Sequence, residues 1–470
     1  MQSQPQSQPI SPAGKRTVSL AIALILLIVG VGVGAGVTYA GLLFGGSITG
    51  GLCTSGKTLT IGLLTDLSSD LASQGVRAKD AALLAVSDIN KYLSSPPGAA
   101  SSGTSACNVK FALSYSDYAL DSSKALTDLQ AFAAAGVQVV VGPLNSGAAS
   151  NILQYAKTNH IVLISPSSTA VSLAIPNDDL FRTAPNDRWQ GQADSAMLKA
   201  EGATKLVILQ RHDPYGDALA NATAANFVAS GQNIQYGVCT ASDTVCILRY
   251  DPNLTTFGTI TPTLSTDFNT LNNTANANKV AIQAISFEEF GELVIELNGS
   301  SSYSYLLKGH LPSATSQWTG TDGEAQDTVI SNKTTSGPIV SNIRLPSTIY
   351  GFPNTTLTQQ LVKNFAGNYT NNVCDNYCRG TYDDVWLGAL ATLSAGAYDG
   401  TKIQAVMLTV ANSYYGVTGW NGLEASGDRI ASTYQIWKVV TPTGGVPTWV
   451  YAGFWDATTN PPSLSGFNPN

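Results

Sequence analysis

The chain has 470 residues, a formal net charge of -7, 44% hydrophobic residues and 12% charged residues. This hydrophobic content excludes an intrinsically disordered chain, and the acidic balance argues against a nucleic-acid partner. The charged fraction is well below the roughly 25% of typical soluble proteins. Uncharged polar residues must therefore cover the surface, for which an acidic exterior is one hypothesis.

The first predicted element is a membrane anchor. Residues 17–56 contain no charged side chain, and residues 18–44 are almost purely apolar. That stretch exceeds the roughly 20 residues that span a bilayer, whereas the apolar core of a cleaved signal has only about 7–15. Because Lys15 and Arg16 precede it, we expect residues 1–16 to be cytoplasmic, residues 17–44 to span the membrane, and the chain beyond the Gly-rich tether 45–56 to be extracellular.

Cysteines and glycosylation sequons also favour an external location. The six cysteines include no Cys-x2-Cys pair, so they predict disulfides rather than a metal site. The expected pairs are Cys53–Cys107, Cys239–Cys246 and Cys374–Cys378. Seven Asn-x-Ser/Thr sequons fit a displayed, glycosylated surface. They begin at Asn221, Asn253, Asn272, Asn298, Asn332, Asn354 and Asn368.

Beyond the tether, short apolar runs alternate with helical patterns, which predicts an α/β fold with βαβ units, a parallel sheet and helices on both faces. The first series has expected strands at 57–64, 109–115, 137–141 and 161–164, and expected helices at 76–93, 122–135 and 147–158. The second has expected strands at 205–210, 234–238, 279–285 and 338–343, and expected helices at 189–201, 216–230 and 287–297. Residues 239–266 are expected to form an irregular loop. Two helices, 358–369 and 383–398, and a strand at 434–440 complete the chain.

Hydroxyl side chains follow two consecutive strands of the first series. Ser146 comes after the strand at 137–141, and the run 167–169 comes after the strand at 161–164. Ligands bind beyond the carboxyl ends of strands in an open parallel sheet, and hydroxyls with free backbone N–H groups suit a carboxylate. The alternative is a pair of ordinary helix N-caps, which Ser and Thr also favour.

A set of short phrases in a fixed order carries a family resemblance over about residues 57–456. The phrases are Ile61–Ser68, Leu71–Gly75, Ala81–Asn90, Gly142–Pro143, Ile164–Thr169, Phe181–Pro185, Asp213–Asp217 and Gly419–Trp437. Their order and spacing resemble the branched-chain amino-acid binding proteins, the type I periplasmic-binding-protein family that feeds ABC importers. The resemblance implies two doubly wound parallel-sheet lobes that close around a ligand. Lobe 1 would hold residues 57–183 and 346–426, and lobe 2 residues 184–345 and 427–470.

The resemblance also implies a binding site for a zwitterion. Ser146 aligns with the serine that binds the ligand carboxylate, Ser168 and Thr169 with the pair that contacts carboxylate and ammonium, and Asp322 with the acid that holds the ammonium. Tyr215 aligns with a cleft tyrosine; the alternative for Tyr215 and for Asp322 is an ordinary turn residue.

Three further candidates are less typical of the family. Asn145 precedes Ser146, Gln74 stands where an aromatic residue is frequent, and Phe287 stands where tyrosine is common. Glutamate is also more frequent where Asp322 stands. These departures favour a ligand more polar than leucine, although plain core packing is an alternative role for Phe287.

No enzymatic activity and no cofactor are expected. His160, His212 and His310 are scattered, and no nucleophile elbow, Walker loop or zinc-protease motif occurs. The resemblance implies a membrane-anchored receptor that delivers an amino acid or related amide to ABC permease and ATPase subunits. A sensor acting through a membrane partner, and a surface structural protein that retains the fold, are the alternatives.

Overall fold

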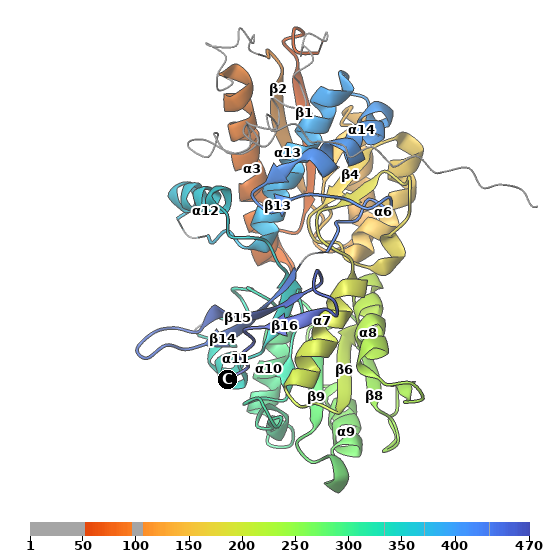
Figure 1. Ribbon diagram of the computed structural model, residues 1–470, viewed down its shortest axis with the longest axis vertical. Helices are drawn as coiled ribbons and strands as arrows, with labels where there is room; N and C mark the ends of the chain where they lie inside the picture. Colours follow the sequence, from red (N-terminus) through yellow and green to blue (C-terminus); the bar gives the residue numbers. More distant parts are fainter. Residues whose placement is uncertain (1–51, 96–106, 333, 371, 432) are drawn as a thin grey trace, which may run out of the picture. The chain divides into compact units, whose positions relative to one another are not determined.

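The computed structural model describes residues 52–95, 107–332, 334–370, 372–431 and 433–470. In this part, two five-stranded parallel sheets form the frameworks of two lobes (Figure 1). The lobe 1 sheet has the order β2-β1-β3-β4-β5. Its strands are β1 (Thr58–Thr65), β2 (Lys110–Asp117), β3 (Val139–Val141), β4 (Val162–Ser165) and β5 (Leu180–Arg182).

Helices cover both faces of the lobe 1 sheet because its strands are apolar on both sides. Val139 and Val141 pack in the cluster formed with α3 and α13, whereas the intervening Val140 packs in the cluster formed with α5 and α6. This alternation follows from the two-residue period of a strand. The helices are α3 (Ala72–Ser94), α5 (Ser122–Ala134), α6 (Ser146–Asn159), α12 (Thr356–Asn368), α13 (Asn376–Ala395) and α14 (Gly400–Ser413).

The lobe 2 sheet has the order β10-β9-β6-β8-β7. Its strands are β6 (Lys205–Arg211), β7 (Ile234–Tyr236), β8 (Val245–Tyr250), β9 (Val280–Ile285) and β10 (Trp318–Thr319). The helices that accompany it are α7 (Asp187–Ala200), α8 (Pro214–Phe227), α9 (Thr261–Leu271), α10 (Phe290–Gly299) and α11 (Gly337–Ile343). Both lobes are therefore α/β with parallel sheets, as predicted.

Several regions differ from the sequence-based prediction, and among them the helix α14 and the strands β5 and β10 were not predicted. The expected loop at 239–266 contains β8 and the start of α9, because Val245–Leu248 is a short apolar run between Thr- and Asn-rich flanks. The expected strand at 338–343 is the helix α11, which Pro338 starts as a first-turn residue.

A four-stranded antiparallel sheet forms near the C-terminus with the order β11-β14-β15-β16. The strand β14 was predicted at 434–440, but its three partners and the sheet were not. Its strands are β11 (Ser347–Tyr350), β14 (Thr433–Val440), β15 (Thr448–Asp456) and β16 (Ser463–Ser465). The strands β12 (Tyr415–Gly416) and β13 (Gly419–Trp420) form a separate small hairpin.

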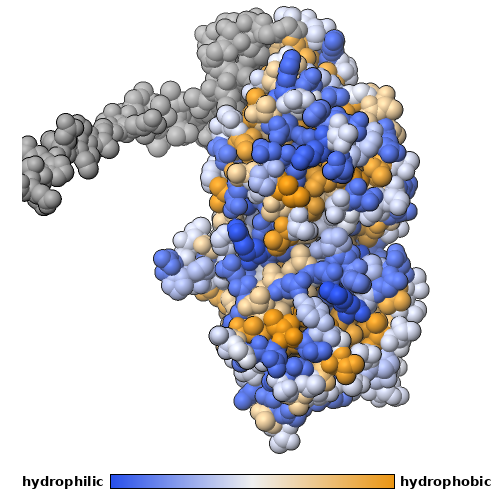
Figure 2. All heavy atoms as spheres, turned by 90° about the vertical axis from the view of Figure 1, so that its right-hand side faces the viewer, coloured by the Kyte–Doolittle hydropathy of each residue, from blue (hydrophilic) through white to orange (hydrophobic). Residues whose placement is uncertain are grey.

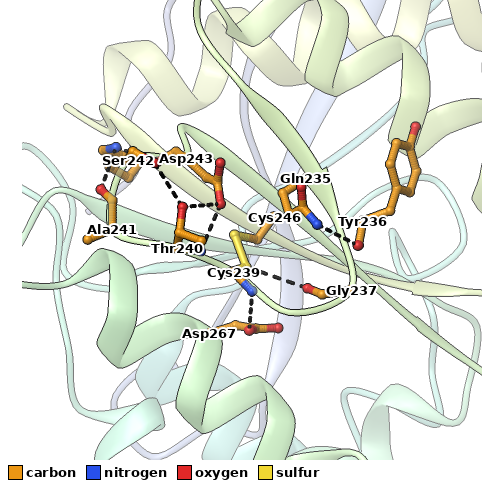
Figure 3. The surroundings of a disulfide bond; sticks show 11 residues. Gln235, Tyr236, Gly237, Cys239, Thr240, Ala241, Ser242, Asp243, Cys246 and Asp267 are labelled. Atoms are coloured by element: carbon orange, nitrogen blue, oxygen red, sulfur yellow. Dashed lines mark hydrogen bonds between the residues drawn. A yellow bond between two sulfur atoms is a disulfide. The ribbon is translucent and has the colours of Figure 1, made fainter.

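All three expected disulfides are formed, Cys53–Cys107, Cys239–Cys246 and Cys374–Cys378. The first joins the residues that lead into β1 and β2, which are paired neighbours. Figure 3 shows the second, which connects the loop after β7 to β8, while the Cys239 N–H donates to Asp267 of α9 at 3.2 Å. Each bridge therefore joins segments within one lobe.

A tight set of contacts holds the connections between the lobes. The Arg182 guanidinium, at the end of β5, pairs with Asp428 at 2.6 Å, and the two side chains are 0% and 1% exposed. Asn186 donates to the other oxygen of Asp428 at 2.8 Å. Arg429 donates to the Thr183 carbonyl at 3.2 Å. The chain that enters lobe 2 at 183–187 is thus bound to the chain that returns at 427–429.

No helix in the described residues is both long enough and apolar enough to cross a bilayer. The predicted anchor at residues 17–44 lies outside the described part of the chain. On the face shown in Figure 2, apolar residues form separate patches among polar ones.

Candidate ligand-binding site

The carboxyl ends of both parallel sheets meet between the lobes, and the lobes touch there. The Ser73 N–H at the start of α3 donates to Glu288 of lobe 2 at 2.8 Å. Gln74 donates to Asp327 at 2.7 Å, and the Glu288 N–H donates to the Asp70 carbonyl at 3.0 Å. The structure is therefore a closed arrangement of the two lobes, and Gln74 acts as a lobe contact in it.

Ser146 lies in the first turn of α6, directly beyond β3, and is 1% exposed. Its Oγ accepts the N–H groups of Thr169 and Ala170, both at 3.1 Å. These N–H groups were expected to be free for a ligand, but the Ser146 hydroxyl uses them. Two accepted bonds leave the hydroxyl proton available as a donor. Together with the positive end of α6, it offers a position for a carboxylate.

We expect Ser146→Ala to lower both affinity and stability. Loss of the hydroxyl donor should weaken amino-acid binding by about 1–2 kcal/mol, and two buried N–H groups lose their acceptor, which should cost about 1–3 kcal/mol of unfolding free energy. Titration calorimetry and thermal unfolding measure the two effects. Ser150→Ala is the matched control, because Ser150 lies one turn further along α6 and is exposed. An unchanged melting temperature for Ser146→Ala would contradict the bonding described here.

The neighbouring candidates differ in whether their side chains bond within lobe 1. Ser168 donates within lobe 1, to the Pro143 carbonyl at 3.1 Å, so its side chain does not face the cleft. Asn145 accepts a bond from the Tyr118 hydroxyl at 2.9 Å. By contrast, no described residue bonds the buried Thr169 hydroxyl. The Thr169 hydroxyl lies close to the Asp187 carboxyl of lobe 2, so a ligand would meet these two side chains together.

Asp322, in the turn after β10, is 2% exposed and lies opposite this loop in the closed cleft. Its Oδ1 accepts bonds from the Tyr215 hydroxyl at 2.7 Å and from Gln190 at 2.9 Å. Both donors are neutral, and no ion pair with a described basic residue is formed at Asp322. The carboxylate is held in place without being neutralised, so it can accept a cation.

Asp187, the first residue of α7, is a second buried acid beside Asp322, and sequence analysis did not identify it. Neither of its oxygens has a hydrogen-bond donor among the described residues. Burial and the charge of Asp322 raise the pKa of Asp187 well above 3.8, and the nearby Thr169 hydroxyl moderates the shift. Gln190 lies one turn further along α7, which places Asp187 and the Gln190 bond to Asp322 on one helix face.

The two carboxyls predict a pH-dependent affinity. Burial raises the pKa of Asp322 to about 6, although the bonds from Tyr215 and Gln190 oppose the shift. A ligand ammonium lowers the pKa of both acids, so the bound protein holds fewer protons than the free protein. Affinity should therefore rise with pH through about 6, and fall by up to about tenfold per pH unit for each proton below it.

Calorimetry in buffers of different ionisation enthalpy measures the released protons directly. Asp322→Asn should release fewer protons than the wild type, because its side chain cannot titrate. Asp267→Asn is the control, since Asp267 accepts the Cys239 N–H away from the cleft. If the affinities of the wild type and of Asp322→Asn were both independent of pH, the assignment of Asp322 and Asp187 to the ligand would be contradicted.

Aromatic rings form the wall next to Asp322. Tyr215 stacks on Phe287 with ring centroids 5.4 Å apart. The Arg211 guanidinium lies over the Phe287 ring at 3.8 Å from its centroid. Phe287 is therefore sandwiched and 4% exposed, and its main role here is to fix Tyr215.

A cavity of about 1120 Å³ opens outward from the start of α6 between the two lobes. Its acidic residues outnumber the two basic residues that line it, Arg211 and His212. The acids are Asp70, Asp121, Asp213, Glu288, Glu289 and Glu292. Among the candidate site residues, Asn145 lines this cavity, whereas Ser146, Thr169, Tyr215 and Asp322 do not. Its acidic lining favours the approach of cationic groups.

The chain is similar to several known proteins. The family described as "Periplasmic binding protein" matches residues 58–242. An uncharacterized protein, MJ1266, from Methanocaldococcus jannaschii is 28% identical over 90% of this chain and 98% of its own length. The Leu/Ile/Val-binding protein BraC3 from Rhizobium johnstonii is 27% identical over 37% of this chain and 45% of its own length.

A solved structure shows the same architecture. The branched-chain amino acid transporter substrate-binding protein LivJ from Streptococcus pneumoniae, in complex with isoleucine, superposes with a TM-score of 0.63. The match covers 84% of this chain and 100% of that protein at 20% identity. Residues 58–242 thus match the periplasmic binding protein family, and the chain as a whole shares the two-lobed fold of LivJ.

Proposed function

We propose that the protein is an extracellular receptor that binds an amino acid or a related small zwitterion between its lobes. The observation that carries this proposal is the pair of buried carboxyls, Asp322 and Asp187, neither of which pairs with a described basic side chain in hydrogen-bonding geometry. Burying two acids is costly unless a cation or a proton neutralises them. A ligand ammonium supplies that charge.

The other end of the ligand meets donors rather than acceptors. The Ser146 hydroxyl proton and the first N–H groups of α6 are available as donors at the start of this helix, where the helix dipole also favours negative charge. The Thr169 hydroxyl can serve either group. A zwitterion with its carboxylate toward α6 and its ammonium toward Asp322 satisfies both ends, each charge-assisted bond contributing about 1.5–3 kcal/mol.

We further propose that the receptor is held at the cell membrane by residues 17–44 and delivers its ligand to the permease and ATPase subunits of an ABC importer. The apolar sequence and the preceding Lys15 and Arg16 support the anchor. The relatives named as amino-acid binding proteins support the transport role. The sequons Asn221, Asn253, Asn298, Asn332, Asn354 and Asn368 are exposed, as glycosylation requires.

Titration of the full chain with matched compounds tests the receptor function. L-leucine carries both charges, 3-methylbutylamine only the ammonium, and 4-methylpentanoate only the carboxylate; other amino acids extend the panel. We expect measurable binding of at least one zwitterion and much weaker binding of its single-charge analogues. If no amino acid or amide binds, the receptor proposal fails and the surface structural protein is the better description.

A further inference from the structure

We propose that Tyr377, at the start of α13 in lobe 1, is a positioning residue that sets the place of Asp322 in lobe 2 when the lobes close. This inference rests on the ligand-binding function proposed above. Tyr377 lies outside the set of residues that would touch the ligand, because it contacts the backbone of Asp322 and not its carboxylate. Residues 322–327 are called the acid segment below.

Lobe 2 anchors the acid segment through Glu324. The N–H of Ser286, at the end of β9, and the N–H of Thr321 each donate to the Glu324 carboxylate at 2.7 Å. Glu324 is 0% exposed, so these bonds are shielded from water. This anchor fixes the middle of the segment and leaves its two ends to other contacts.

Lobe 1 holds both ends of the acid segment. The Tyr377 hydroxyl donates to the Asp322 carbonyl at 3.0 Å. At the other end, the Asn376 N–H donates to Gln326 Oε1 at 3.3 Å, and Arg77 donates to the Gln326 carbonyl at 3.4 Å. Gln326 has a φ of 64°, in the left-handed region that is unfavourable for a residue with a side chain. Such a conformation persists where its surroundings determine it.

The first turn of α13 is itself rigidly held, so Tyr377 can fix the position of Asp322. The Cys374–Cys378 disulfide spans this turn. Asp375 accepts the Cys378 N–H at 2.9 Å and pairs with Arg77 at 3.1 Å, with side chains 3% and 2% exposed. The disulfide and the buried ion pair thus fix the backbone on both sides of Tyr377, and α13 packs along α3 of lobe 1 (Figure 1).

The contacts at the two ends of the acid segment are therefore formed only when lobe 1 and lobe 2 are in contact. When the lobes separate, Asp322 loses the Tyr377 bond, and Gln326 loses the Arg77 bond to its carbonyl and the Asn376 bond to its side chain. Closure then does more than cover the ligand, since it also orders the acid that binds the ammonium. A ligand that binds Asp322 and closure of the lobes stabilise each other through this contact.

Tyr377→Phe tests the proposal because it removes only the hydroxyl. Titration of the full chain with L-leucine should show a dissociation constant raised by about 3- to 10-fold. In the Asp322→Asn background the same change should have little effect, because the acid that it positions is gone. Tyr382→Phe is the matched control: Tyr382 lies on the same helix, but its hydroxyl donates to Asp88 inside lobe 1.

Hydrogen exchange of the acid segment gives a readout that does not depend on the ligand. In Tyr377→Phe, and in the double variant Cys374→Ser/Cys378→Ser, the amides of residues 323–327 should exchange several-fold faster than in the wild type. Cys239→Ser/Cys246→Ser, which removes the remote lobe 2 bridge, should leave them unchanged. Wild-type protein that does not bind L-leucine would count against the receptor function for this ligand, and exchange would then decide the positioning role. If Tyr377→Phe changed neither the exchange of residues 323–327 nor the affinity, the positioning role of Tyr377 would be overturned.

Discussion

Replacing Asp322 by asparagine should weaken amino-acid binding by about 30- to 1000-fold, or about 2–4 kcal/mol. The substitution preserves the shape of the side chain and an oxygen that can accept the bonds from Tyr215 and Gln190. It removes the charge that faces the ligand ammonium. The loss is large because the site is closed, and water cannot screen or replace the missing carboxylate.

The matched variants separate this effect from instability. Asp267→Asn changes another buried acid of lobe 2, one that accepts the Cys239 N–H at 3.2 Å outside the cleft. It should leave affinity unchanged. Asp187→Asn should reduce affinity as well, but less than Asp322→Asn, because the pKa of Asp187 is raised so far that its proton must first be displaced. Wild-type affinity in Asp322→Asn would remove this acid from the site.

Most strands of the two parallel sheets were predictable because they are short, apolar and separated by helical patterns, whereas β5, β8 and β10 were missed. Val139–Val141 is apolar throughout, which is the signature of a strand buried on both faces. The antiparallel sheet was not predictable in the same way. β14 largely alternates buried and partly exposed residues, but its partner β15 does not, so the pairing of the two strands depends on tertiary packing rather than on local sequence.

The candidate site was predicted in part. Ser146, Thr169, Tyr215 and Asp322 all lie at strand ends, where chain order alone brings functional residues together. Asp187 was missed because an acid at the start of a helix is the ordinary choice near a positive dipole. Its distinguishing property, burial without a donor, is a fact of the folded state. Ser168 shows the converse, since its hydroxyl follows the expected strand but bonds inside lobe 1.

The second large effect should come from Asp428, which pairs with Arg182 rather than with the ligand. We expect Asp428→Ala to lower the free energy of unfolding by about 3–5 kcal/mol, the scale for leaving one partner of a buried ion pair uncompensated. Denaturant unfolding measures the change. Glu424→Ala is the control, because Glu424 pairs with Arg188 at 3.7 Å where both are exposed, and exposed pairs contribute about 0–1 kcal/mol.

Asp428 should also affect binding, because its partner Arg182 also holds the loop proposed to bind the ligand carboxylate. Besides Asp428, the Arg182 guanidinium donates to the carbonyls of Ser168 and Ala170 at 3.0 and 2.8 Å. That loop carries Thr169 and the N–H groups that orient Ser146. Without Asp428, the buried guanidinium would move toward other acceptors and release the loop. The double variant Arg182→Met/Asp428→Leu removes both charges and should recover stability relative to Asp428→Ala, but it should not recover affinity, since the loop remains unsupported. Full recovery of both would show that Arg182 acts on folding alone.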